Sequence, residues 1–380
     1  MHLDEQATAY RVAPLGPVES WACARPSWDD LARGAPFRSF AWLSTWWRHY
    51  GAGHELLTLG VYDRAERLVG IAPWYLETSA AEGRVIRPLG TGEVCSDYLS
   101  ILCDADGEQE TRVATALAEW LTSDAAPEWD LLHLDAVDQD DTAIARLAAA
   151  LAALGCKTHQ QETFRCWRLA LPESWDEFLM MQSKSHRKQL RRLEKRGMEQ
   201  FHARLVPANE ANFQQAWQIL IDLHQRRRVS LGEPGCFASP RFAQFHRDAA
   251  EQFLAAGQLR LFWLELDGLP VAAEYQLAGE GVTYAYQAGV DPDRLDAEPG
   301  RLIMIATIRA AIDAGQQGFD YLRGDEPYKV HWRAEPRQAY SWRVAANSPQ
   351  ARLRHKLWLT TGNVKGWLKG ARSLVAGSEA

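Results

Sequence analysis

The sequence predicts an α+β protein made of two similar units, each a mixed β-sheet with helices packed against it. The main observation is a repeat, because the same order of hairpin, further strands, helix and strand returns about 200 residues later in the chain. A length of 380 residues fits two or three domains. Hydrophobic residues form 47% of the chain and charged residues 24%, which excludes a disordered or low-complexity protein.

The first unit opens with a hairpin. Residues 56–62 have the composition of a strand, the charged residues 63–67 that of a turn, and residues 68–75 that of the returning strand. A helix is expected over 110–122, where Val113, Leu117 and Leu121 recur at helical spacing. Further strands are expected over 85–89, 98–102 and 129–134.

The second unit repeats this order. A strand over 259–266 turns at Asp267 and Gly268 into a strand over 270–277. A strand over 282–288, a helix over 299–314 and a strand over 319–322 are expected to follow. We interpret the repeat as a duplication, with an N-terminal domain at 1–155, a C-terminal domain at 156–345 and a basic tail at 346–380.

Long helical segments lie between the strands of the two units, and we expect helices over 143–154, 175–196 and 213–228. Along the second of these, one apolar stripe is formed by Leu179, Ser183, His186, Leu190 and Leu193. We therefore expect His186 to be a core histidine.

The overall charge and the cysteines limit the kinds of ligand. The net charge of −7 disfavours a protein that coats DNA, so we expect no DNA partner. The six cysteines include no C-x-x-C pair, which argues against a zinc ribbon or a disulfide scaffold and favours a reducing cytoplasm. The N-terminus lacks the pattern of a secretory signal, and the apolar run 302–308 is too short to span a bilayer. We expect no metal site.

A basic segment lies in the helix expected over 175–197. Seven Lys and Arg residues fall between positions 184 and 196 against one acid, Glu194. Like charges at this spacing repel, so a phosphate or carboxylate ligand would relieve the repulsion. Arg187 and Arg191, one turn apart beside the apolar stripe, are the predicted contacts. The alternative is a solvated basic face paired with acids elsewhere.

Two further segments carry candidate chemistry. Pro299 is a typical first helical residue, and Gly300 next to it would let an anion approach the free N–H groups of the helix start. A plain proline-capped helix is the alternative. The segment 320–332 follows a strand and offers Asp325, Tyr328 and Lys329 as acid, phenol and ammonium. The alternative for this segment is a charged loop with a structural salt bridge.

These residues resemble a known family. Glu298-Pro299-Gly300, an apolar helix and 319–329 with its G-D-x-x-Y-K string resemble a pattern of the cellulose-biosynthesis-associated branch of the GNAT acetyltransferase superfamily, which is related to the Fem-type peptidyltransferases. Cys95-Ser96-Asp97-Tyr98-Leu99 resembles its N-terminal half. The resemblance covers about residues 35 to 345. It implies tandem GNAT-like domains and acyl transfer from an acyl-CoA donor to an envelope polysaccharide, glycolipid or related precursor.

The sequence departs from the family at two points. The usual pyrophosphate loop, Q/R-x-x-G-x-G/A, does not occur over 291–301, and Glu298 stands where the family has serine. Two alternatives therefore stay open. The first is Fem-like transfer from an aminoacyl-tRNA, for which the basic helix offers a phosphate footprint, and the second is a non-catalytic glycan-binding or scaffold protein.

We expect direct transfer without a covalent enzyme intermediate, because no activated Ser or Cys is evident. Asp325 would deprotonate or orient the acceptor, Tyr328 would protonate the leaving group, and Lys329 would stabilise the oxyanion. Asp97 and Tyr98 would shape the cleft or form a structural pair. The candidate catalytic residues are Asp325, Tyr328 and Lys329; the candidate donor-binding residues are Tyr286, Gln287, Pro299, Gly300 and Arg301; the candidate acceptor-binding residues are Arg187, Arg191, Asp97, Tyr98 and Arg323.

The C-terminal tail suggests a membrane contact. Six basic residues against one acid lie between positions 346 and 380, and apolar residues recur near helical spacing over 352–375. A helix of this kind could rest on an anionic membrane, which would place the protein at the inner face. A basic helix packed on the protein's own acidic surface is the alternative.

Overall fold

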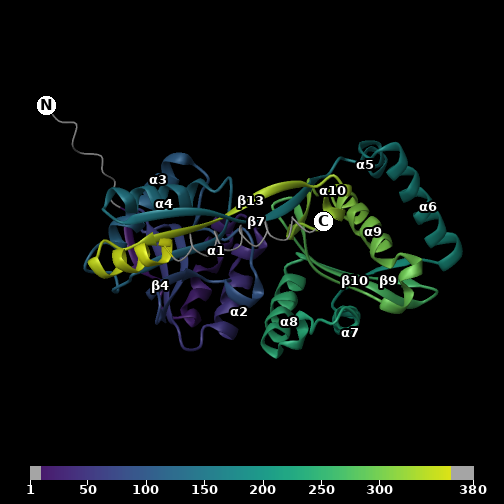
Figure 1. Ribbon diagram of the computed structural model, residues 1–380, viewed down its shortest axis with the longest axis horizontal. Coiled ribbons are helices and arrows are strands. Elements are labelled where there is room, and N and C mark those ends of the chain that lie inside the picture. The colour runs from purple at the N-terminus through teal and green to yellow at the C-terminus, as the bar shows by residue number, and fades with distance from the viewer. Residues whose placement is uncertain (1–9, 361–380) are drawn as a thin grey trace, which may run out of the picture.

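One β-sheet runs through residues 10–360, the part of the chain that the computed structural model describes. The strands follow one another across the sheet in the order β1-β2-β3-β4-β6-β13-β7-β12-β11-β10-β9-β8, and β5 pairs with β3. Helices pack on both faces of the sheet (Figure 1). The predicted α+β class with a mixed sheet is therefore confirmed.

The strands are β1 (Arg11–Pro14), β2 (Glu55–Tyr62), β3 (Leu68–Ser79), β4 (Gly83–Pro88), β5 (Leu102–Cys103), β6 (Leu131–Asp138), β7 (Lys157–Ala170), β8 (Arg204–Pro207), β9 (Leu259–Leu266), β10 (Leu269–Gly279), β11 (Val282–Val290), β12 (Gly318–Arg323) and β13 (Glu335–Ala345). The α-helices are α1 (Arg25–Ala32), α2 (Phe40–Tyr50), α3 (Gly107–Leu121), α4 (Thr142–Ala153), α5 (Trp175–Met181), α6 (Lys184–Phe201), α7 (Phe213–Ser230), α8 (Pro240–Ala255), α9 (Pro299–Asp313) and α10 (Pro327–His331), and a further helix covers 349–360.

The two halves of the sheet repeat one topology. In the first half β2, β3 and β4 are antiparallel neighbours, and β4 then pairs in parallel with β6. In the second half β9, β10 and β11 are antiparallel neighbours, and β11 then pairs in parallel with β12. The repeat seen in the sequence is thus a repeat of structure.

The two halves exchange their last strands. β7 follows the first half in the chain but pairs with β12 of the second half. β13 follows the second half but pairs with β6 of the first half. β7 and β13 also pair with each other, from Arg168 opposite Glu335 to Lys157 opposite Ala345. Because backbone hydrogen bonds run unbroken across this junction, neither half is a separate sheet.

Two predicted elements differ in the structure. The helix expected over 175–196 is two helices, α5 and α6, because the Ser183 side chain accepts a hydrogen bond from the His186 N–H and caps a new helix start. The strand expected over 98–102 is reduced to β5. The residues before it form a loop in which Cys95 and Tyr98 have positive φ.

The largest hydrophobic cluster joins the two halves. Trp42 of α2 meets Phe245 of α8 edge to face, with ring centroids 4.9 Å apart. Two further clusters lie on the other face of the sheet, one under α3 and α4 and one under α9. Across residues 10–360, no helix combines the length and the hydrophobicity needed to cross a bilayer.

Candidate functional site

The strands β11 and β12 separate part-way along their length. They pair in parallel only from Val282 opposite Gly318 to Tyr284 opposite Asp320. Beyond this point β11 continues to Val290 and β12 to Arg323 without pairing to each other. A cavity of about 400 Å³ occupies the opening. We call it the split cavity, and its size is in the range of small-molecule sites.

Side chains from both faces of the sheet line the split cavity. On one face, Arg228 of α7 and Phe242 of α8 reach it. On the other face, Met304 of α9 and Tyr328 of α10 reach it. Tyr286 and Gln287, predicted to bind the donor, line it from β11. Elements from both faces of the sheet therefore meet around one cavity.

The wall of the split cavity is also the seam between the two halves. Asp97, from the loop after β4, accepts a hydrogen bond from Arg323 Nε at 2.9 Å. Burial raises the pKa of Asp97, and the Arg323 guanidinium opposes that rise. The Tyr98 hydroxyl donates to Asp320 at 2.6 Å, and Arg168 Nε donates to the same carboxylate at 2.8 Å. Asp97 and Arg323 line the cavity while bonding to each other, whereas Tyr98 lies outside its lining.

Lys329 lies in the wall beside β12. Only 2% of the residue is exposed. Its ammonium donates to the carbonyl oxygens of Leu322, Arg323 and Gly324 at 3.2, 2.9 and 2.9 Å, and pairs with Glu326 at 2.9 Å. Gly324 has a φ of 113°, which a residue with a side chain rarely adopts. Lys329 therefore holds the bend that ends β12 and places positive charge behind it.

The structure separates Asp325 from its predicted neighbours. The Asp325 side chain is 53% exposed, pairs with Arg165 and accepts a hydrogen bond from Trp167. These hydrogen bonds, that from Arg165 first, lower the pKa of Asp325. It is not among the residues that line the split cavity, whereas Tyr328 and Lys329 are.

A second opening lies between α6 and the start of α9. Lys188, Arg192 and Arg196, each one turn apart on α6, face Arg301 across a space of about 290 Å³. Glu298 bridges Arg196 at 3.0 Å and Arg301 at 2.6 Å. Within residues 10–360, Lys188 and Arg192 have no ion pair. We call these four cations the basic groove.

The predicted anion contacts on α6 lie elsewhere. Arg187 directs Nη1 to the Met180 sulfur at 2.9 Å, and Arg191 is exposed. Neither lines the basic groove or the split cavity. The adjacent stripe of α6 faces the start of α9 instead. The side chains of Arg187 and Arg191 therefore point in a different direction from those that line the basic groove.

Helix α9 connects the two openings. Arg301 lines the basic groove and Met304 the split cavity, and three residues correspond to about 4.5 Å along a helix. Glu298 precedes the helix with a φ of 56°, and its side chain does not cap the helix. Pro299 is buried and Gly300 is exposed. A Cβ at Gly300 would meet only Val290, at 3.5 Å, so the chain's own packing does not demand glycine there.

Comparisons with known proteins identify the fold. Residues 182–330 match the family described as an acetyltransferase (GNAT) domain. The chain has a GNAT fold. A crystal structure of FemX is 12% identical, with a TM-score of 0.61 over 87% of this chain and 98% of FemX. The C-terminal domain of a putative lysylphosphatidylglycerol synthetase from Agrobacterium fabrum is 9% identical, with a TM-score of 0.51 over 88% of this chain and 95% of that one. A comparison with curated protein sequences gives no match.

A buried acid of the GNAT domain was missed by the sequence analysis. Glu274, in the middle of β10, lines the split cavity and is 4% exposed. Burial raises its pKa to about 8, and a hydrogen bond from Gln276 opposes the rise only in part. The available signal was an acid placed between the apolar residues Val271 to Ala273 and Tyr275 of a predicted strand.

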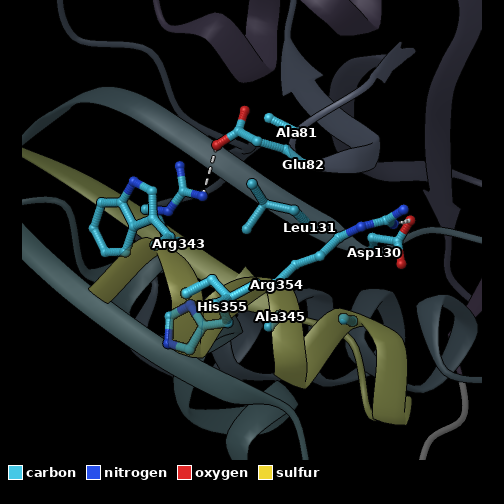
Figure 2. A pocket seen from close by; sticks show the side chains of 11 residues that line it. Ala81, Glu82, Asp130, Leu131, Arg343, Ala345, Arg354 and His355 are labelled. Atoms are coloured by element: carbon cyan, nitrogen blue, oxygen red, sulfur yellow. Dashed lines mark hydrogen bonds and ion pairs between the residues drawn. The ribbon is translucent and has the colours of Figure 1, made fainter. Parts of the chain in front are cut away.

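Figure 2 shows a different cavity of the GNAT fold, between the end of β13 and the helix over 349–360. The charges around it are paired. Arg343 bonds to Glu82 at 2.7 Å and stacks on Trp358, and Arg354 bonds to Asp130 at 2.6 Å. These contacts fasten the last described helix to the first half, and the groups they use are not available to a ligand. We therefore place the candidate site in the split cavity.

Proposed function

We propose that this protein is an acyltransferase in which an acceptor amine or hydroxyl attacks the carbonyl carbon of an acyl donor held between β11 and β12. The observation that carries the proposal is the split cavity, which opens between two separating strands and is lined from both faces of the sheet. The GNAT fold supports the same reaction class.

The chemistry follows from the walls of the cavity. Beyond Tyr284, alternate backbone N–H groups of β11 point toward the opening, because β12 no longer pairs with them. Such N–H groups stabilise the negative charge that develops on a carbonyl oxygen under attack. Lys329 keeps the opposite wall in place. Burial raises the pKa of Tyr328, so its phenol stays neutral and acts as a hydrogen-bond donor.

The donor in this proposal carries phosphate groups, as acyl-CoA does. Its acyl end would lie in the split cavity and its phosphates in the basic groove, which α9 joins over one turn. Arg fits phosphate oxygens with two parallel hydrogen bonds, and both Arg192 and Arg301 face the groove. An envelope polysaccharide, glycolipid or related precursor is the proposed acceptor.

A second candidate is aminoacyl transfer from an aminoacyl-tRNA. The observation that favours it is the line of exposed cations along α6, since Lys184, Lys188 and Arg191 have no ion pair within residues 10–360. A tRNA would span this line as well as the groove. Its binding would depend steeply on salt, because each phosphate contact releases counterions.

The reaction is tested by supplying either acetyl-CoA or aminoacyl-tRNA together with ethanolamine, which offers both an amine and a hydroxyl. Mass spectrometry would detect the acylated product and free CoA or tRNA. Turnover with acetyl-CoA supports the first candidate, and turnover with aminoacyl-tRNA supports the second. Binding of both donors without any product would show a non-catalytic module.

The location of the site is tested by filling one cavity at a time. Ala288 is exposed on β11 and lines the split cavity, so Ala288→Phe should lower kcat/KM at least 10-fold by excluding a reactant. Ala81 is exposed and lines the cavity of Figure 2, so Ala81→Phe is the matched control and should change kcat/KM less than twofold. If Ala81→Phe lowered kcat/KM and Ala288→Phe did not, the active site would lie in the cavity of Figure 2.

The groove is tested by the double variant Lys188→Gln and Arg192→Gln. It should weaken CoA binding about 10-fold and reduce the dependence of log Kd on log salt concentration by about 2. Lys195 points away from the groove, and its variant Lys195→Gln should leave CoA binding unchanged. If Lys195→Gln weakened CoA binding as much as the double variant does, the basic residues would act through their overall positive charge and not through a phosphate site.

A further inference from the structure

Glu274 is a carboxyl group without a cationic partner inside the sheet. It shares its face of β10 with Ala272, which packs in the cluster under α9. The Gln276 amide donates a hydrogen bond to Glu274 at the long distance of 3.5 Å. None of the ion pairs within residues 10–360 involves Glu274, although a buried charge normally has such a partner. Packing alone gives no reason for an acid at this position.

The groups around Glu274 do not supply the missing charge. Tyr321 of β12 and Tyr328 of α10 face it, and the Tyr321 hydroxyl is buried with no hydrogen-bond partner among the described residues. The cations of the same cavity are already used. Lys329 pairs with Glu326 at 2.9 Å, and Arg228 pairs with Glu233 at 2.8 Å. Glu274 therefore holds its proton near neutral pH, in agreement with its raised pKa of about 8.

We propose that Glu274 is the proton-transfer residue of the split cavity. The proposal rests on the acyl transfer inferred above. The step starts from the ionised form of Glu274, whose share grows as the pH rises. As the acceptor nitrogen or oxygen bonds to the donor carbonyl carbon, the proton of the acceptor passes to the Glu274 carboxylate. The bond from that carbon to the sulfur or oxygen of the donor then breaks, and the same proton passes from Glu274 to the leaving atom. The enzyme returns to its starting state, and no other reactant is needed.

The structure favours Glu274 over Asp325 for this role. A base is most effective when its pKa lies near the working pH, because it is then both ionised and able to hold a proton. Asp325 lies outside the cavity lining, and Arg165 and Trp167 hold it ionised. Glu274 lines the cavity together with two phenols, Tyr321 and Tyr328, and is itself 4% exposed.

The first test needs no substrate. The carboxyl carbons of the full chain are labelled with carbon-13 in glutamate, and their signals are followed by NMR from pH 4 to 10. One signal should titrate near pH 8 and should vanish in Glu274→Gln. The matched control is Glu265→Gln on β9, which removes a buried acid that pairs with Arg204 and should leave this signal in place. A Glu274 signal that titrates near pH 4 would overturn the proposal.

The second test measures acetyl transfer from acetyl-CoA to ethanolamine. In the wild type, kcat/KM should rise with pH through about 8. Glu274→Gln should lower kcat at least 100-fold with less than a threefold change in KM for acetyl-CoA, and should abolish the rise with pH. Glu265→Gln should keep both. Full turnover in Glu274→Gln would overturn the proton-transfer role alone, whereas absence of turnover in the wild type with acetyl-CoA and also with aminoacyl-tRNA would overturn the acyl transfer on which it rests.

Discussion

Replacement of Lys329 by methionine tests how the wall of the split cavity is held. Methionine keeps most of the length of the side chain and its buried stem but removes the ammonium. The ammonium makes three hydrogen bonds to backbone carbonyls, of Leu322 at 3.2 Å and of Arg323 and Gly324 at 2.9 Å. Without the ammonium, these three carbonyl oxygens lose a hydrogen-bond donor. They lie in a segment that is largely shielded from water.

The magnitude follows from those contacts. A hydrogen bond to a charged group contributes about 1.5 kcal/mol or more, and water from the cavity can replace part of it, so we take about 1 kcal/mol for each carbonyl. Lys329→Met should therefore lower the free energy of unfolding by about 3 kcal/mol. Guanidinium unfolding followed by tryptophan fluorescence and by circular dichroism would measure this change.

The matched control is Lys195→Met on α6, where the lysine side chain is 71% exposed and its carboxylate partner, Glu199, is 3.8 Å away. This variant should stay within about 0.5 kcal/mol of the wild type. If Lys329→Met were as stable as Lys195→Met, the three carbonyl contacts would not support the bend. The part assigned here to Lys329 would then be wrong.

Three further predictions concern the seam, the buried acid and the tail. Asp97→Ala leaves Arg323 without its partner across the two halves and should lower the free energy of unfolding by about 3 kcal/mol, whereas Glu251→Ala, which breaks an exposed pair with Arg247, should not change the unfolding midpoint. Glu274 has a pKa of about 8 in the folded state against a usual 4.5, so the folded protein holds this proton more tightly than the unfolded chain. The free energy of unfolding of the wild type should therefore fall, on the order of 4 kcal/mol, as the pH rises from 5 to 9, and that of Glu274→Gln should not. Parallel pH profiles of stability for the two proteins would contradict this. The predicted membrane segment 352–375 lies mostly outside the described residues, but its first part, 352–360, is helical and Leu353 is exposed there. The full chain should float with vesicles that contain anionic lipid, and a chain that ends at Thr360 should not. The shortened chain keeps the Arg354–Asp130 pair, which holds the last described helix in place, but loses three of the six basic residues of the tail. Equal flotation of the two chains would refute a membrane role for the tail.

The sequence was most informative where apolar segments are bounded by clear turn or helix-start residues. The hairpin of β9 and β10, which turns at Asp267 and Gly268, and the helix α9, which starts at Pro299, were predicted close to their observed bounds for this reason. β7 was not predicted, since its first half, Lys157 to Glu162, is polar and mostly exposed on both faces. Its place in the sheet depends on pairing with β13, which lies 165 or more residues away in the chain and cannot be read locally.

The candidate site was predictable to a similar degree. The strand exit that carries Tyr328 and Lys329 and the helix start at Gly300 were found from local patterns. The orientation of α6 was not, because helical spacing defines several basic stripes and does not say which of them faces α9. Lys188 and Arg192 therefore line the groove in place of Arg187 and Arg191. Glu274 escaped notice because only the fold shows that the cavity reaches it.

The exchanged strands also have a consequence for synthesis on the ribosome. The edge of β6 is covered only by β13, which ends at Ala345, whereas β6 itself ends at Asp138. At 5 to 20 residues per second, the edge stays uncovered for roughly 10 to 40 s while the rest of the chain emerges. An open strand edge is a template for pairing with other chains. The period before β13 is synthesised is therefore the stage at which this protein is most exposed to aggregation and to capture by chaperones.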